Sequence, residues 1–204
     1  IREVAAQRRE DLRDQYRIMM QHHRPQELIF IDETGIDRSL ARQYGYSIKG
    51  QRAEVRRPRT NKLRISVISA IGYDAYLSVR VLEPGDKFNR IVFEDFLRND
   101  IVPLLNPYNG RNARSIIVLD NHAVHHVAEV QEIINGTGAL LRFLPPYSPD
   151  LNPIEGSYNQ AKHFLRENDT AFRCCFQPRP FILYAFGQIT HDNCKGYFSQ
   201  CGYQ

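Results

Sequence analysis

Three strand-like segments come before the first helix of the main part of the chain, and this order restricts the possible folds most strongly. The run ELIFIDE (27–33) is apolar, β-branched and aromatic, so we expect a buried strand that stops at Asp32. KLRISVISAIG (62–72) and YLSVRVLEPG (76–85) alternate apolar and polar residues across a short gap, which predicts a hairpin. Three successive strands of this kind favour an antiparallel meander.

Helices and strands alternate after these three strands. Helical patterns cover 89–105, 126–138 and 154–167, and strand patterns cover 114–121 and 139–144. Such alternation adds parallel strands through right-handed crossovers. We therefore predict an α/β fold with a mixed five-stranded sheet and helices on both faces.

The first residues have a different pattern from the rest. Residues 2–23 have helical spacing and end before Pro25, so we expect a linker helix over 1–25 and one domain over 26–204. The chain starts with Ile, which suggests that an N-terminal part is missing.

No apolar run is long enough to span a bilayer and no signal peptide is evident, so we expect a soluble, intracellular protein. The four cysteines fit free thiols better than a zinc site.

Three acidic residues lie at the ends of the predicted strands or at the start of a predicted helix. Asp32 and Asp120 come at the ends of two buried strands, and ligands gather at such ends in α/β sheets. Either aspartate alone is better explained as a turn former. Glu155 also has a structural explanation, because Asn152, Pro153 and Glu155 match the N-cap, N1 and N3 positions of a capping box.

Together the three acids indicate a metal site. Carboxylates that converge without a base between them repel one another unless cations are present, and hard oxygen ligands suit Mg²⁺ or Mn²⁺. Two such ions about 3.5–4 Å apart can activate a nucleophile and stabilise the leaving oxygen in phosphodiester chemistry. The prolines of RFLPPYSPDLNPIE (142–155) restrict the backbone before Glu155 and predict a fixed position for its carboxylate.

Three motifs resemble those of a known superfamily. FIDETG, VLDNHAVHH and LPPYSPDLNPIE look like the catalytic motifs of mariner-superfamily DDE transposases and related bacterial insertion sequences. The 34 residues between Asp120 and Glu155 match the spacing of that superfamily. The resemblance implies a ribonuclease H-like fold and a metal-binding catalytic triad of Asp32, Asp120 and Glu155. It also implies metal-dependent cleavage at transposon ends, strand transfer to target DNA, and an upstream helix-turn-helix DNA-binding region.

Other residues of these motifs are candidates for supporting roles. Glu33 lies beside Asp32, but it faces the opposite way on an extended strand and ranks second as a metal ligand. Asn121 and His125 match the second motif and can orient Asp120 or contact phosphate, and Asn152 belongs to the third. His122 and His126 are expected on a helix surface.

A basic stretch follows the first motif. Residues 49–64 contain one acid and seven bases, Lys49, Arg52, Arg56, Arg57, Arg59, Lys62 and Arg64. Such a stretch can neutralise DNA phosphates, and the net charge of +4 is compatible with a polyanionic partner. A solvated loop, or a contact with the second subunit of a homodimer on DNA, explains it as well.

Two other functions fit the same residues. One is a domesticated derivative that binds DNA or protein without catalysis, and the other is a stand-alone ribonuclease H-like nuclease acting on RNA–DNA hybrids. The closing segment (189–203) resembles that of the superfamily, and we expect a nuclear protein, with the bacterial cytoplasm as the alternative.

Overall fold

The computed structural model describes residues 8–38, 40, 46–54, 64–122, 125 and 128–204. Within these residues the strands form a five-stranded sheet of order β3-β2-β1-β4-β5. Neighbours pair antiparallel from β1 to β3, and β4 pairs parallel with both β1 and β5. The predicted mixed sheet and its hairpin are therefore confirmed. The strands are β1 (Leu28–Asp37), β2 (Arg64–Gly72), β3 (Tyr76–Val81), β4 (Ile116–Leu119) and β5 (Leu140–Phe143).

Strand β1 does not stop at Asp32, and this part of the sequence prediction was wrong. The strand continues to Asp37 because β2 pairs with it over its whole second half, ending with Asp37 opposite Arg64. Strand β4 is shorter and pairs only with residues 28–30 of β1. Asp32 therefore lies inside a strand, just beyond the point where its parallel neighbour ends.

The register of β1 and β4 brings the two aspartates together. Phe30 lies opposite Val118, so Asp32 and Asp120 each come two residues after a paired position. Side chains alternate along a strand, and positions two apart share a face. The predicted approach of the two acids thus follows from strand pairing, even though only one of them ends a strand.

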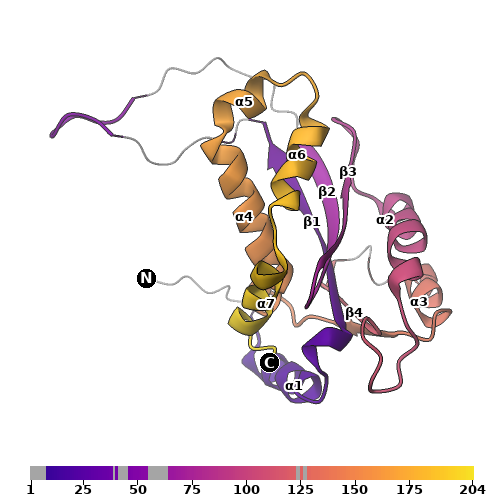
Figure 1. Ribbon diagram of the computed structural model, residues 1–204. Helices are drawn as coiled ribbons and strands as arrows, with labels where there is room; N and C mark the ends of the chain where they lie inside the picture. The colour runs from indigo at the N-terminus through magenta and orange to yellow at the C-terminus, as the bar shows by residue number, and fades with distance from the viewer. Residues whose placement is uncertain (1–7, 39, 41–45, 55–63, 123–124, 126–127) are drawn as a thin grey trace.

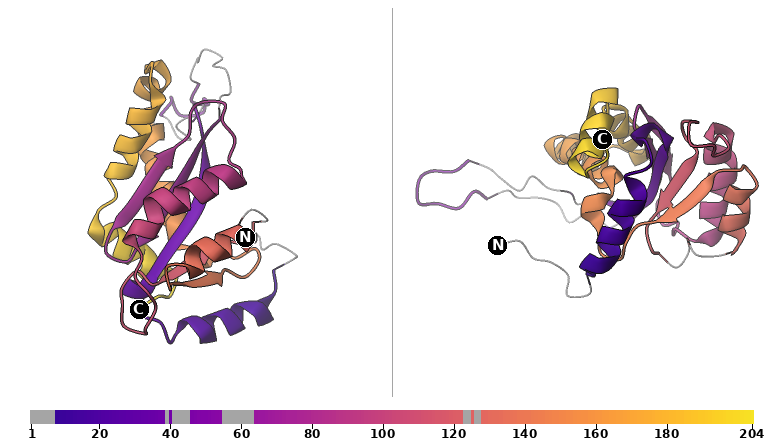
Figure 2. Two further views of the ribbon diagram at one scale, coloured as in Figure 1. Left: turned by 90° about the vertical axis from the view of Figure 1, so that its right-hand side faces the viewer. Right: turned by 90° about the horizontal axis from the view of Figure 1, so that it is seen from below.

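Helices cover both faces of the sheet, as predicted (Figures 1 and 2). One face carries α2 (Arg90–Phe96), which continues through a π turn at Leu97–Ile101 and a 3-10 turn at Val102–Leu104, and α3 (Ala128–Asn135). The other face carries α1 (Glu10–Met20), α4 (Pro153–Glu167), α5 (Asp169–Cys174), α6 (Pro178–Gly187) and α7 (His191–Gln200).

Strand β1 separates two hydrophobic cores. Leu28 and Phe30 belong to the core beneath α4, whereas Ile29 and Ile31 belong to the core beneath α2 and α3. All four side chains are buried, which explains why the run is apolar at every position rather than at every second one. This central strand is the rigid support for Asp32.

The N-terminal helix packs on the domain that follows it. In the described residues α1 ends at Met20, before Pro25 as the sequence predicted, and a 3-10 turn begins at Pro25. Tyr16 and Met20 lie in the same core as Phe30. The division into a linker helix and a domain at residue 25 stays a prediction.

No helix in the described ranges is long and apolar enough to cross a membrane. All four cysteines are free thiols.

Candidate active site

Asp32, Asp120 and Glu155 lie on one cleft. Strand β1 supplies Asp32, the residue after β4 supplies Asp120, and the first turn of α4 supplies Glu155. The cleft has a volume of about 470 Å³. The remaining lining residues come from the loop after β4 and from the proline-rich segment, and they are Asn121, His122, Leu144, Pro145, Pro146, Tyr147, Ser148, Pro149 and Asn152.

Asp32 is the most buried of the three acids. Its side chain accepts a hydrogen bond from Asn152 Nδ2 at 2.8 Å and one from the Glu33 backbone N–H at 2.8 Å. Burial raises the pKa of Asp32 to about 8, and the negative charges of Glu33 and Asp120 contribute to the rise. A carboxyl group of this kind favours a nearby cation, because a cation offsets both causes of the shift.

Asp120 is held in its ionised form by its neighbours. His125 Nδ1 lies 2.7 Å from Asp120 Oδ1, and the His122 backbone N–H donates to the same oxygen at 2.9 Å. Burial alone would raise the pKa of Asp120, but these contacts outweigh it and lower the pKa below its usual value. The pKa values of Asp32 and Asp120 are therefore shifted in opposite directions although the two acids line one cleft.

His125 explains how Asp120 is oriented. Its ring is fully buried, with its centroid 4.5 Å from that of Phe93, and its Nε2 lies 3.8 Å from Glu33 Oε2. The predicted supporting role of His125 therefore has a structural basis. Glu33 faces away from Asp32 toward this imidazole, as the alternation of the strand predicted, and it does not line the cleft. Burial raises the pKa of Glu33.

The capping box, the structural alternative for Glu155, has its residues at the matching positions but lacks its side-chain hydrogen bonds. Asn152 is the N-cap residue of α4 and Pro153 occupies N1, but no side-chain hydrogen bond caps the helix. The Asn152 amide instead donates to Asp32. Glu155 at N3 is thus available to the cleft. Burial raises its pKa, against an opposing attraction from Lys162.

The other predicted residues have different positions. Asn121 lines the cleft and its Nδ2 donates to the Leu144 carbonyl, which joins the end of β4 to the proline-rich segment. His122 is not on a helix, which corrects the prediction, because it lines the cleft beside Asp120. His126 lies outside the described residues.

The basic stretch is described only in part. Lys49 and Arg52 are exposed in a segment that Figure 1 shows away from the sheet, and Arg64 is exposed at the start of β2. None of these three side chains lines the cleft. The other four predicted bases lie outside the described residues, namely Arg56, Arg57, Arg59 and Lys62.

Two further residues near the acids were not singled out from the sequence. Lys162 lies two turns after Glu155 on α4 and its Nζ donates to Thr34 Oγ1 at 2.6 Å. Helical spacing from Glu155 could have found it. Tyr158 donates from its hydroxyl to the Asp32 carbonyl at 2.6 Å and accepts from Ser69. No sequence pattern reveals that contact, because it joins residues 126 positions apart.

The donor set of the cleft fits a hard divalent cation. Three carboxylates are such donors. Burial, with the negative charges of Glu33 and Asp120, raises the pKa of Asp32, and a bound cation would offset both causes. Among the described residues, no three His, Cys, Asp or Glu side chains already enclose one point, so side-chain rotation is needed to close on an ion.

Comparison with known proteins gives a family and a fold. The sequence profile of the DDE superfamily endonucleases matches residues 27–174, a range that includes all three acids. No curated protein matches the chain.

Solved structures of the Mos1 transposase are similar in fold. Its catalytic domain with raltegravir and Mg has a TM-score of 0.64 at 14% identity, over 98% of this chain and 92% of that one. The Mos1 mariner paired-end complex with Mn gives 0.62 at 17% identity, over 100% of this chain and 65% of that one. The Mos1 paired-end complex with the left transposon end gives 0.56 at 19% identity, over 95% and 60%. The predicted ribonuclease H-like fold is thus confirmed, and this chain spans about 60–65% of the length of the transposases in the two DNA complexes.

Proposed function

This chain belongs to the DDE superfamily endonucleases, and on that premise we propose that it is the catalytic domain of a mariner-like DNA transposase. It cuts DNA strands at transposon ends and joins the freed 3′ ends to target DNA. The observation that carries the proposal is that Asp32, Asp120 and Glu155, from three separate elements, line one cleft. The similarity to Mos1 structures solved with transposon ends and as a strand transfer complex supports it.

The three acids are proposed to hold two Mg²⁺ or Mn²⁺ ions. Structures of the Mos1 catalytic domain contain Mg or Mn, and the similarity in fold between that domain and this chain supports the same ions here. When bound, such ions activate a water or 3′-hydroxyl nucleophile and stabilise the leaving oxygen. The protein's own contribution is geometry. Asn152 orients Asp32, His125 orients Asp120, and Pro153 fixes the first turn of α4 so that Glu155 stays at the cleft.

The DNA backbone is proposed to follow Lys162 of α4 and the basic stretch that comes after β1. Lys162 is close enough to Glu155 for their charges to interact, and Arg64 in turn affects the pKa of Lys162. Burial lowers the pKa of Lys162, against the attraction of Glu155. Lys49 and Arg52, with the other four bases of the stretch, extend the positive charge along the chain.

The remaining partners are also proposals. We propose a homodimer on DNA, since the Mos1 complexes are paired-end complexes, and a nuclear location, since the resemblance of the closing segment favours a eukaryotic host. Sedimentation of the protein with and without duplex DNA tests the dimer. A monomer on DNA contradicts it.

The test of the proposed function is a cleavage assay on supercoiled plasmid DNA with MnCl₂ or MgCl₂. We expect metal-dependent nicking by the wild-type chain and none by Asp120→Ala or Glu155→Gln. Glu167→Gln is the matched control, because Glu167 lies on the same helix with a side chain that is 60% exposed. Full nicking by Glu155→Gln refutes the proposal.

Two further substrates separate the proposal from its rivals. A duplex oligonucleotide with a free 3′-hydroxyl, mixed with plasmid, should become covalently joined to the plasmid. Cleavage of RNA–DNA hybrids without any joining indicates a stand-alone nuclease. Absence of both nicking and Mn²⁺ binding indicates a non-catalytic derivative.

A further inference from the structure

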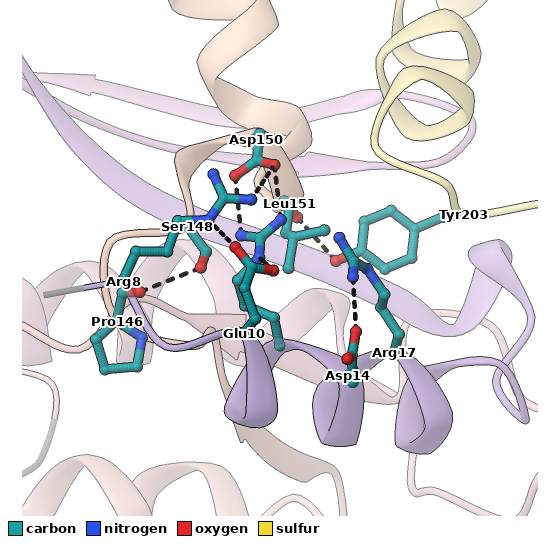
Figure 3. Close-up of polar contacts among 10 residues, drawn as sticks. Arg8, Glu10, Asp14, Arg17, Pro146, Ser148, Asp150, Leu151 and Tyr203 are labelled. Carbon is teal, nitrogen blue, oxygen red and sulfur yellow. Dashed lines mark hydrogen bonds and ion pairs between the residues drawn. The ribbon is translucent and has the colours of Figure 1, made fainter. Parts of the chain in front are cut away.

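The proline-rich segment has two sides. One side lines the cleft through residues 145–149 and Asn152. The other side is held from behind by the N-terminal helix and by the end of the chain, at Asp150 and Leu151 (Figure 3). A segment that contributes a wall to the cleft is therefore anchored by elements that do not reach the cleft.

Arg13 of α1 makes the strongest of these contacts. Its Nη1 and Nη2 donate to the two carboxylate oxygens of Asp150 at 3.0 Å and 2.8 Å, and its Nε donates to Glu10 at 3.2 Å. The Arg13 side chain has no exposed surface. Burying a guanidinium is unfavourable unless it is paired, and a bidentate pair fixes orientation as well as distance. Arg8 Nη2 adds a second positive charge 3.6 Å from Asp150.

The end of the chain holds the neighbouring residue. Tyr203 donates from its hydroxyl to the Leu151 carbonyl at 2.8 Å, and Tyr16 of α1 is hydrogen-bonded to that hydroxyl at 2.8 Å. Leu151 itself is buried in the core beneath α4. Two residues of α1, Arg13 and Tyr16, therefore fix two successive residues of the segment, one directly and one through Tyr203.

These anchors are close in sequence to the catalytic groups. Asp150 and Leu151 lie in a 3-10 turn (Pro149–Leu151) that leads directly to Asn152, the residue that donates to Asp32, and then to α4 and Glu155. Tyr147 has a φ of +53°, a left-handed conformation that a residue other than glycine keeps only when its surroundings impose it. The segment is thus held in one conformation by contacts outside it.

We propose that the Arg13–Asp150 ion pair is a positioning contact for catalysis. Through it, α1 fixes the wall of the cleft and the placement of Asn152 and Glu155. This inference rests on the proposed function, because positioning is meaningful only if the cleft is catalytic. Arg13 touches neither DNA nor metal in this account and acts only through Asp150.

The test uses Arg13→Met, which keeps the length of the side chain and removes its charge, and Asp150→Asn, which keeps the size of the acid. The readouts are kcat and KM for Mn²⁺-dependent nicking of supercoiled plasmid. We expect kcat to fall roughly 10- to 100-fold with KM for DNA nearly unchanged, because misplacement of catalytic groups by about 1 Å has an effect of that size. Arg13→Lys should give an intermediate kcat, since lysine restores the charge without the bidentate geometry.

Two controls distinguish positioning from loss of structure. Arg17→Met removes an exposed partner of Asp14 on the same helix and should leave kcat unchanged. Hydrogen exchange should increase in residues 147–152 of Asp150→Asn while β1 stays protected, which also keeps the test informative if Arg13→Met does not fold. A wild-type kcat in folded Arg13→Met or Asp150→Asn, or equal losses in Arg17→Met, overturns the inference. If Glu155→Gln still nicks DNA, the proposed function fails instead.

Discussion

Asn152 offers a sharp test, because its two possible roles predict different results. As a helix cap it stabilises α4, whereas as a donor to Asp32 it prepares the cleft for a cation. The structure contains the second contact, at 2.8 Å and with Asn152 only 4% exposed, and lacks the first. Asn152→Ala should therefore change metal binding more than stability.

The size of the effect follows from the type of contact. A hydrogen bond to a charged group contributes about 1.5–3 kcal/mol. Since about 1.4 kcal/mol corresponds to a factor of ten in an equilibrium constant, the affinity for Mn²⁺ should fall roughly 10- to 100-fold in Asn152→Ala. The affinity of Asn152→Asp for Mn²⁺ should also differ from that of the wild type. This substitution removes the hydrogen-bond donor to Asp32 and adds a fourth negative charge to the cleft.

The assay is a calorimetric titration of the metal-free protein with MnCl₂, together with thermal unfolding in EDTA. Asn135→Ala is the control, since Asn135 is exposed at the end of α3 on the other face of the sheet. Asn152 acts as a helix cap, and not as a donor that prepares the metal site, if Asn152→Ala binds Mn²⁺ as tightly as the wild type and instead loses about 1 kcal/mol of stability, the usual contribution of an N-cap.

Three other predictions concern the cleft and its support. His125→Ala should raise the pKa of Asp120 and reduce nicking, which a pH–rate profile of the variant detects as a shift of its acid limb to higher pH. Burial and neighbouring charge raise the pKa of Asp32 to about 8 in the folded protein, so the folded state binds more protons than the unfolded state between about pH 4 and 8. Stability of the metal-free protein should therefore fall as pH rises through this range, and a Tm that is independent of pH, or unchanged in its pH dependence by Asp32→Asn, contradicts that. Gly156→Ala should destabilise the packing of α4 on α7 by about 1–3 kcal/mol, because a Cβ there would lie 2.5 Å from the Tyr197 ring, and urea unfolding measures the loss.

Strand patterns and motif spacing predict the sheet, and they predict that the three acids lie at one site. Alternation over 62–72 and 76–85 predicts the hairpin that β2 and β3 form, and short apolar runs predict the two central strands. The sequence correctly predicts that Asp32 and Asp120 lie close together, but the reason for that prediction holds for only one of the two acids. Both acids were expected at strand ends, but Asp32 is inside β1, and the strand register brings the pair together.

What the sequence did not reveal depends on contacts between distant segments. The length of β1 is set by its pairing with β2. The residues Thr34 and Gly35 do not by themselves predict that the strand continues past Asp32. Arg13 lies on a helix rich in charge, where a solvated side chain is the normal expectation, and its burial depends on Asp150, 137 positions away. Asn152 matches the capping pattern in sequence, but its side-chain amide donates a hydrogen bond to the buried Asp32 carboxylate and does not cap the helix.

We propose that Asp32, Asp120 and Glu155 hold two divalent metal ions in one cleft. An anomalous difference map from crystals of the protein grown with MnCl₂ tests it most directly. We expect two manganese peaks, together bound by carboxylate oxygens of all three acids, at distances of about 2.1 Å, close to those of Mg²⁺. Manganese bound elsewhere on the protein, with no peak among these three carboxylates at saturating MnCl₂, would contradict it.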